Sequence, residues 1–293
     1  KIKKLEKRDI ALILQKNEAF STQALRVLAC ASGKGKDITF LGLVGMSDPA
    51  REEGKSAIAL CTKAGIRSVM ITGDHALTAK AVAHTVGIEG EVITGVEMDT
   101  LSDAQLQKCV KRVSIYARVS SLHKQRILKA FQKNGEVVAM TGDGVNDAPA
   151  LKQADVGVAM NIKGTEVSKD VSDLILLDDN FTTIVAAVEE GRTIYGNIKK
   201  FVKYLLAANL GEVVIVTASL LFKLPLPLLP LQILWLNLVT DSFPALALGI
   251  DPADPQVMVR KPRDPQESFF KGIRSFMFFS TLFSVACVLG IFL

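Results

Sequence analysis

Two long apolar segments near the C-terminus constrain the fold of this chain more than any other feature. Residues 205–222 and 226–250 each approach the roughly 20 residues that an α-helix needs to cross a bilayer. The link Lys223-Leu224-Pro225 is too short to form a domain, and a third apolar segment begins near Ile273. Hydrophobic residues make up 49% of the 293 residues, which is high for a soluble protein. We therefore expect a multi-pass integral membrane protein in contact with the lipid bilayer.

The positive charges indicate which side of the membrane each flank occupies. Basic residues precede the first apolar segment and follow the second: Lys199, Lys200, Lys203, Arg260, Lys261, Arg263, Lys271 and Arg274. By the positive-inside rule, both flanks are cytosolic and the proline-rich turn is external. The net charge of +5 is modest, and its positives lie beside apolar segments rather than among aromatics. This pattern favours a membrane border and no nucleic-acid partner.

Polar residues interrupt both apolar segments at helical spacing. They are Asn209 and Glu212 in the first, and Asn237, Thr240 and Asp241 in the second. Each set presents one oxygen-bearing face, and a carboxylate in mid-membrane costs at least a few kcal/mol, so these residues are expected to be functional. Pairing with lysines, or helix association through Asn237, is the structural alternative. Pro244 and Gly249 should loosen the second helix and free backbone carbonyls nearby.

The preceding part of the chain holds a strand, a turn and a helix start between Val137 and Lys152. Gly142 and Gly144 permit a tight turn, and Asp143, Asn146 and Asp147 gather oxygens at the end of the strand. The third glycine of a dinucleotide loop, the Gly-Lys-Ser/Thr of a P-loop and the acidic spacing of an EF-hand are missing. Closely spaced carboxylates suit Mg²⁺ beside phosphate, which predicts a phosphoryl-transfer site; an acidic loop capped by glycines is the alternative.

A second strand, turn and helix repeats this form, with Thr72-Gly73-Asp74 after an expected strand at 67–71. Strands and helices alternate from Ile38 to Leu177, which predicts an α/β doubly wound parallel sheet with both Thr-Gly-Asp loops at one edge. A further strand at 114–117 leads to Arg118 and Lys124, and the alternative for these two residues is that they are simply solvated charges. Near the N-terminus, the spacing of apolar residues predicts a helix over 19–31.

The string from Thr141 to Leu151 resembles the hinge motif of the P-type ATPases, ion pumps whose phosphorylation domain has the haloacid-dehalogenase fold. Three other stretches resemble the same family in order: Thr22 to Ala29, Met46 to Arg51, and Arg118 to Lys124. Ala50 and Ser121 stand where many relatives have proline. The resemblance implies that ATP phosphate is contacted by Arg26, and that nucleotide is held by Asp48, Arg51, Arg118 and the loop of Thr72, Gly73 and Asp74.

The same resemblance implies the catalytic roles. Asp143 would hold Mg²⁺, Lys124 would neutralise the phosphoryl group in transfer, and Asn146 and Asp147 would order the pocket. The aspartate that takes the γ-phosphoryl group of ATP belongs to an Asp-Lys-Thr-Gly-Thr motif upstream, which this sequence does not contain. We therefore expect the chain to be a fragment that does not turn over ATP alone.

The membrane residues resemble the fifth and sixth helices of calcium pumps of the sarco/endoplasmic reticulum type. All five oxygen ligands of those helices are matched, whereas sodium–potassium pumps carry Asp where Asn237 stands. Calcium favours six to eight oxygens, so further ligands would come from the fourth and eighth helices, which are absent here. The expected transported ion is Ca²⁺, exported from the cytosol; Mn²⁺, Na⁺ or another cation is the alternative.

These expectations divide the chain into four parts of a type II P-type ATPase. They are the end of the nucleotide-binding domain (1–35), the phosphorylation domain (36–180), a stalk helix (181–204) and membrane helices at 205–222, 226–250 and 273–293 with a cytosolic loop at 251–272. The expected partners are ATP, the transported cation, the bilayer and the remaining nucleotide-binding, actuator and membrane segments of the pump. A soluble haloacid-dehalogenase phosphatase would leave the polar membrane faces unexplained, and a membrane scaffold would leave the phosphate-site residues unexplained.

Overall fold

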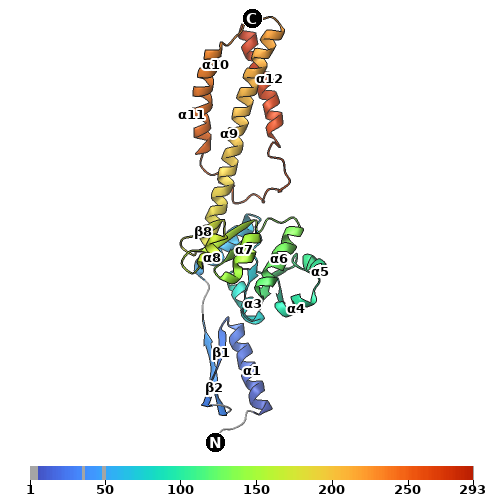
Figure 1. The fold of residues 1–293 in the computed structure, drawn as a ribbon, viewed down its shortest axis with the longest axis vertical. Coiled ribbons are helices and arrows are strands. Elements are labelled where there is room, and N and C mark those ends of the chain that lie inside the picture. The colour runs from blue at the N-terminus through green and yellow to red at the C-terminus, as the bar shows by residue number, and fades with distance from the viewer. Residues whose placement is uncertain (1–5, 35–36, 48–50, 293) are drawn as a thin grey trace. The chain divides into compact units, whose positions relative to one another are not determined.

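The computed structural model of the chain describes residues 6–34, 37–47 and 51–292 (Figure 1). Contacts divide the chain into two compact units, Lys1–Val185 and Ala186–Leu293, each of which is treated by itself. This division does not test the four-part boundaries expected from the sequence, which stay predictions.

The N-terminal segment is a helix followed by an antiparallel hairpin. Helix α1 (Lys7–Thr22) ends before Ala24, whose φ of 60° is left-handed, and β1 (Arg26–Lys34) pairs with β2 (Asp37–Met46). The predicted helix over 19–31 is therefore wrong. The left-handed residue stops the helix, and the apolar positions after it pair across the hairpin instead. The hairpin also removes residues 38–46 from the parallel sheet in which they were expected.

The first parallel sheet has the order β3-β5-β4, formed by Met70–Ile71, Val113–Ala117 and Glu91–Thr94. Helices α2 (Glu52–Lys63), α3 (Ala76–Thr85), α4 (Gly95–Thr100), α5 (Asp103–Cys109) and α6 (Ser121–Lys133) connect or follow these strands. Every residue of the central strand β5 is buried. Its Tyr116 packs with Met98, Leu106 and Ile127, and burial raises the pKa of the Tyr116 hydroxyl.

The second parallel sheet has the order β6-β7-β8, formed by Ala139–Gly142, Val156–Met160 and Leu174–Leu176. The connecting elements are η1 (Val145–Asp147), α7 (Ala148–Gln153) and α8 (Glu166–Asp170). Met140 and Leu151 form a buried cluster against which Ile71 of β3 packs, so β3 and β6 lie near each other. The expected α/β class with parallel strands is found, but in two three-stranded sheets, because in the described ranges β3 and β6 each pair on one edge only.

The second unit consists mainly of apolar helices. They are α9 (Phe181–Leu221, which begins in the first unit), α10 (Pro230–Leu236), the π-helix η2 (Asn237–Asp241), α11 (Ser242–Gly249) and α12 (Ile273–Phe292). Three stretches are long and apolar enough to cross a membrane: 181–221, 230–249 and 273–291. Lys203 of α9 lies 3.7 Å from the ring centroid of Phe276 on α12.

The loop between α11 and α12 is fastened to α9. Arg192 donates to the carbonyls of Val257 and Arg260 at 3.0 and 2.9 Å. One turn or more along the helix, Asn197 donates to the carbonyl of Asp251 at 2.6 Å, and Lys200 forms an ion pair with the Asp251 carboxylate. These contacts hold the end of α11 against the polar part of α9.

Packing at Gly157 generates a stability prediction. A Cβ atom at Gly157, in the central strand β7, would lie 2.6 Å from the backbone oxygen of Leu151, which no side-chain rotation can relieve. Gly157→Ala should therefore destabilise the protein by about 1–3 kcal/mol. Thermal unfolding of the purified protein in detergent should show a lower midpoint. Gly54→Ala is the control. Gly54 lies in α2, its Cβ would meet only Val86, at 3.8 Å, and alanine favours a helix more than glycine does. An equal loss of stability in both variants would contradict the prediction.

Candidate functional site

The start of helix α6 is joined to the loop after β6 by two polar contacts. Lys124 forms an ion pair with the Asp147 carboxylate, and Ser121 Oγ donates to the backbone oxygen of Asn146 at 2.6 Å. The side chains of Asp147 and Lys124 are 8% and 20% exposed. Gly142 makes room for this pair, because a Cβ atom there would lie 2.7 Å from Asp147 Cβ. Lys124 and the loop after β6 are therefore joined by direct contacts and form one candidate site.

The Thr-Gly-Asp loop after β3 is bound to the chain that leads into α6. Thr72 Oγ1 donates to Asp74 Oδ2 at 3.0 Å and accepts from the Asp74 N–H at 3.1 Å. The N–H groups of Arg118 and Val119 donate to the carbonyls of Asp74 and Thr72 at 3.0 and 3.2 Å. Arg118 has a φ of 51°, a left-handed conformation that is uncommon for arginine. The loops after β3, β5 and β6 thus come together around the N-terminus of α6.

Asp143 has the properties expected of a magnesium ligand that works beside phosphate. Its backbone oxygen accepts from Thr165 N at 2.9 Å and from Ser168 Oγ at 3.3 Å, so the loop is fixed. Its side chain is exposed, and the described residues offer its carboxylate no hydrogen-bond partner. Because Mg²⁺ usually binds one or two carboxylates together with substrate phosphate and water, this carboxylate fits the ion.

The structure describes only some of the residues that were expected to contact the nucleotide. Arg26 lies in β1, but its side chain is outside the description, and Asp48 lies outside the described residues. Arg51 is an exposed residue at the N-cap of α2. The pKa of Asp178 lies below its ordinary value, chiefly because the Thr183 hydroxyl donates to it, with Arg51 among the smaller contributions. The nucleotide roles of these residues stay predictions.

The polar residues of the membrane helices meet across α9 and η2. Asn209 Nδ2 donates to Asp241 Oδ2 at 2.9 Å. The Asn237 amide, with its nitrogen turned toward Glu212, lies 3.1 and 3.2 Å from the two carboxylate oxygens. Each carboxylate therefore faces an amide of the other element. Asp241 Oδ1 is buried and has no hydrogen-bond partner among the described residues, which leaves an acceptor oxygen for a cation.

One backbone carbonyl beside this cluster lacks its helical hydrogen-bond donor because of Pro244. Proline has no N–H, so the carbonyl of Thr240 four residues earlier lacks its helical donor. Tyr204 Oη donates to that carbonyl at 2.7 Å instead, while Thr240 Oγ1 donates to the Leu236 carbonyl at 2.6 Å. The expected freeing of carbonyls near Pro244 is thus seen at Thr240. Tyr204 did not stand out in the sequence. It lies five residues before Asn209 on the same helix, and the one available signal for a freed carbonyl was Pro244.

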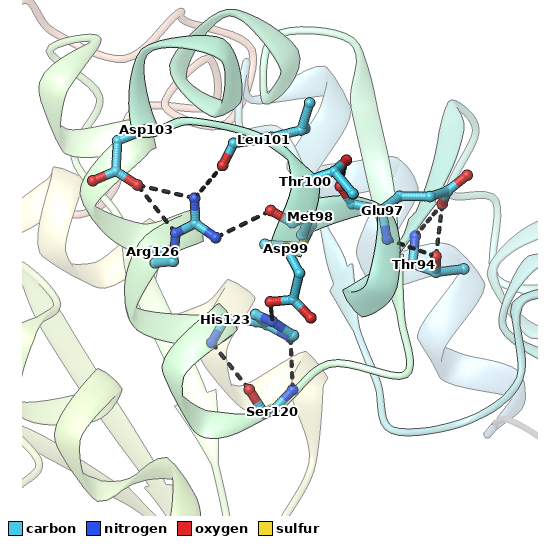
Figure 2. A network of polar contacts seen from close by, with 10 residues as sticks. All are labelled: Thr94, Glu97, Met98, Asp99, Thr100, Leu101, Asp103, Ser120, His123 and Arg126. Atoms are coloured by element: carbon cyan, nitrogen blue, oxygen red, sulfur yellow. Dashed lines mark hydrogen bonds and ion pairs between the residues drawn. The ribbon is translucent and has the colours of Figure 1, made fainter.

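Sequence reasoning also missed the polar network that surrounds the start of α6 (Figure 2). His123 precedes Lys124, is 8% exposed, and places Nε2 2.8 Å from Asp99 Oδ1. Nothing in the spacing of these two residues marks them as neighbours, because α4 and α5 lie between the strand that precedes Asp99 and the strand that precedes His123.

Comparison with known sequence families finds one match in each part of the chain. The family described as haloacid dehalogenase-like hydrolase matches residues 4–155. The family described as the C-terminus of cation transporting ATPases matches residues 225–293. With the three apolar helices, the second match makes this a multi-pass integral membrane protein.

Several bacterial relatives match most of the chain. A calcium-transporting ATPase of Bacillus subtilis is 52% identical over 85% of this chain and 30% of the relative. A calcium-transporting ATPase of Bacillus cereus is 49% identical over 96% of this chain and 33% of the relative. A third, from Listeria monocytogenes, is 48% identical over 90% of this chain and 32% of the relative. The chain thus spans about a third of the length of these relatives.

These matches confirm the resemblance to P-type ATPases that the motifs indicated. They agree with the parallel sheets of the first unit and the apolar helices of the second. By the extent of the match over residues 4–155, the chain belongs to the haloacid dehalogenase-like hydrolase family.

Proposed function

We propose that this chain is part of an ATP-driven pump that exports Ca²⁺ from the cytosol through an aspartyl-phosphate intermediate. The observation that carries the proposal is the pair of membrane carboxylates, Glu212 and Asp241, each facing an amide of the other element. A soluble phosphatase has no use for such a cluster in apolar helices. The names of the bacterial relatives, all calcium-transporting ATPases, support the choice of ion.

In this proposal the centre around Lys124 handles the phosphoryl group. A carboxylate oxygen of the upstream aspartate attacks the γ-phosphorus of ATP, the bond to the bridging oxygen breaks, and ADP leaves. The ammonium group of Lys124 offsets negative charge on the phosphoryl group in transfer, and Asp143 would hold a Mg²⁺ ion, which would supply further charge stabilisation there. Asn146 and Asp147 keep Lys124 in place, and the loop of Thr72, Gly73 and Asp74 closes the pocket.

The unpaired sheet edges support an upstream origin for the nucleophile. Strands β3 and β6 each lack a second neighbour within the described residues, and Ile71 of β3 packs beside Met140 of β6. A strand inserted between them would pair with both and join the two sheets. Its C-terminal end would lie beside the Thr72 loop and the hinge loop, since parallel strands end at one edge. In this proposal that strand carries the phosphorylated aspartate, and the chain alone does not turn over ATP.

The membrane cluster would bind the transported cation. The side-chain oxygens come from Asn209, Glu212, Asn237, Thr240 and Asp241, and Ca²⁺ takes six to eight oxygens, so other helices of the pump would complete the shell. Helix α9 carries Glu212 and begins at Phe181, which packs against the core of the first unit. We propose that this helix couples the phosphorylation state to ion binding. Mn²⁺ or Na⁺ remains the alternative cargo, because the same oxygens bind them.

The role of Asp143 predicts the first kinetic result. Asp143→Asn in the full-length protein should lower phosphoenzyme formation from ATP by about 100-fold or more at millimolar Mg²⁺, because the metal supplies several kcal/mol of charge stabilisation. Raising Mg²⁺ should restore part of the rate, and removing Mg²⁺ from the unsubstituted protein should abolish it. Asp170→Asn is the control, since Asp170 is an exposed carboxylate at the end of α8. Normal phosphorylation of Asp143→Asn would exclude the assigned role.

The membrane cluster predicts the cation dependence of the same reaction. Unsubstituted full-length protein should form acid-stable phosphoenzyme only when Ca²⁺ is present, and Asp241→Asn or Glu212→Gln should raise the Ca²⁺ concentration required by about tenfold or more, because ligand charge sets affinity. Glu190→Gln is the control, since Glu190 is exposed on the same helix as Glu212. Titration with Mn²⁺ and Na⁺ in parallel identifies the cargo. Phosphorylation that needs no cation, or that all variants show equally, would argue against a transport site here.

A further inference from the structure

The helix that carries Lys124 is held by contacts that the proposed catalytic residues do not make. In Figure 2, α4 and the start of α5 lie against α6, and the polar side chains of His123 and Arg126 point toward them. His123 and Arg126 are three residues apart, so they share one face of α6. Lys124 lies on a different face, where it meets Asp147. The helix is thus held from one direction and presents its charge in another.

The contact nearer to Lys124 is made by His123. The N–H of Ser120 donates to His123 Nδ1 at 3.1 Å, which makes Nδ1 an acceptor and leaves the proton of the neutral ring on Nε2. Nε2 then donates to Asp99 Oδ1 at 2.8 Å. His123 is buried, whereas the Asp99 side chain is 67% exposed. One imidazole therefore caps α6 with one nitrogen and fastens it to α4 with the other.

The second contact is made one turn later by Arg126. Its guanidinium donates to the carbonyls of Met98 and Leu101 at 3.1 and 2.7 Å and to Asp103 Oδ1 at 3.1 Å. Two of these three acceptors belong to the backbone, so the hold on α6 at this turn does not depend on Asp103. At the turn of Lys124, by contrast, Asp99 is the acceptor that joins His123 to α4.

Helix α4 is itself placed close to the site. A Cβ atom at Gly95 would lie 2.4 Å from the Arg118 carbonyl and 2.9 Å from His123 Nδ1, so α4 begins in contact with both the left-handed Arg118 and the imidazole. A capping box at Thr94 and Glu97 starts the helix, and donation from the Thr94 backbone and hydroxyl lowers the pKa of Glu97. Glu97 is therefore ionised at neutral pH, and the cap is retained.

We propose that Asp99 and His123 are positioning residues for phosphoryl transfer: the Asp99–His123 hydrogen bond sets the placement of the first turn of α6 and thereby of the Lys124 ammonium group. The inference rests on the proposed function. A displacement of 1 Å can cost about 100-fold in rate, so a shift of part of an ångström should cost on the order of tenfold. The loss should appear in the rate at saturating ATP, because Asp99 and His123 are assigned no contact with the nucleotide.

The test is rapid-quench phosphorylation of the full-length protein at several ATP concentrations, with its transported cation saturating. Asp99→Ala should lower the maximal rate about tenfold and leave the half-saturating ATP concentration within about twofold. Asp99→Asn should restore most of the rate, since its amide oxygen still accepts from His123 Nε2. Asp103→Ala is the matched control: it removes an equally exposed carboxylate from the same network, and its rate should stay near that of the unsubstituted protein.

A double-mutant cycle separates positioning from general destabilisation. In His123→Asn the amide oxygen can replace Nδ1 in the cap but cannot reach Asp99. This variant should lose as much rate as Asp99→Ala, and the double variant should lose no more than either single one. If Asp99→Ala does not fold, His123→Asn alone carries the comparison with Asp103→Ala.

The outcomes distinguish this inference from the proposed function. Phosphorylation of the unsubstituted protein with equal rates in Asp99→Ala, His123→Asn and Asp103→Ala would overturn the positioning role and leave the pump intact. Additive losses in the double variant, or losses that track thermal stability, would also overturn it. Absence of phosphoenzyme in the unsubstituted protein would overturn the proposed function and the inference together.

Discussion

The ion pair between Lys124 and Asp147 is the contact on which the arrangement of the first unit depends. Both side chains are largely buried, and removing one partner of such a pair costs about 3–5 kcal/mol because the other charge remains. The pair joins helix α6 to the turn after β6. Helix α6 follows the central strand of the first parallel sheet, and β6 belongs to the second sheet, so the pair links the two. Within the residues that the structure describes, the two sheets share no strand, so this ion pair and the contact of Ile71 with the Met140 cluster join them.

Part of this structure could be predicted from the sequence because the signals were local. The Thr-Gly-Asp turns, the buried run of β5 and the apolar helices each follow from neighbouring residues, and the predicted α/β class follows from their alternation. The helix predicted over residues 19–31 was wrong. The apolar residues there have helical spacing, but the left-handed conformation of Ala24 ends the helix. The hairpin partner of that segment is β2, and the pairing of the two strands has no local signal in the sequence.

The roles assigned to single site residues stay predictions, and the contacts between these residues were not predicted from the sequence. Lys124 and Asp147 were each expected near phosphate, yet their direct pairing depends on how β5 and β6 are placed. The contacts of His123, Asp99 and Arg126 join segments separated by a strand and a helix, and no periodicity encodes such contacts. In the membrane part, the five polar residues were expected to form two faces. The structure adds that the amide of each face lies against a carboxylate of the other. Pairing across elements is a property of the packed chain and has no local sequence signature.

The proline at 244 has a consequence for how the Thr240 carbonyl can become available to a ligand. A regular helix would have to lose a backbone hydrogen bond before one of its carbonyls could accept from, or bind, another group. In this chain the Thr240 carbonyl is already separated from its helical donor, and the Tyr204 hydroxyl occupies it. Rotation of one side chain is faster than local unwinding of a packed helix, which takes microseconds or longer. The irregular backbone thus allows the Thr240 carbonyl to become available through the movement of one side chain, without unwinding of the helix.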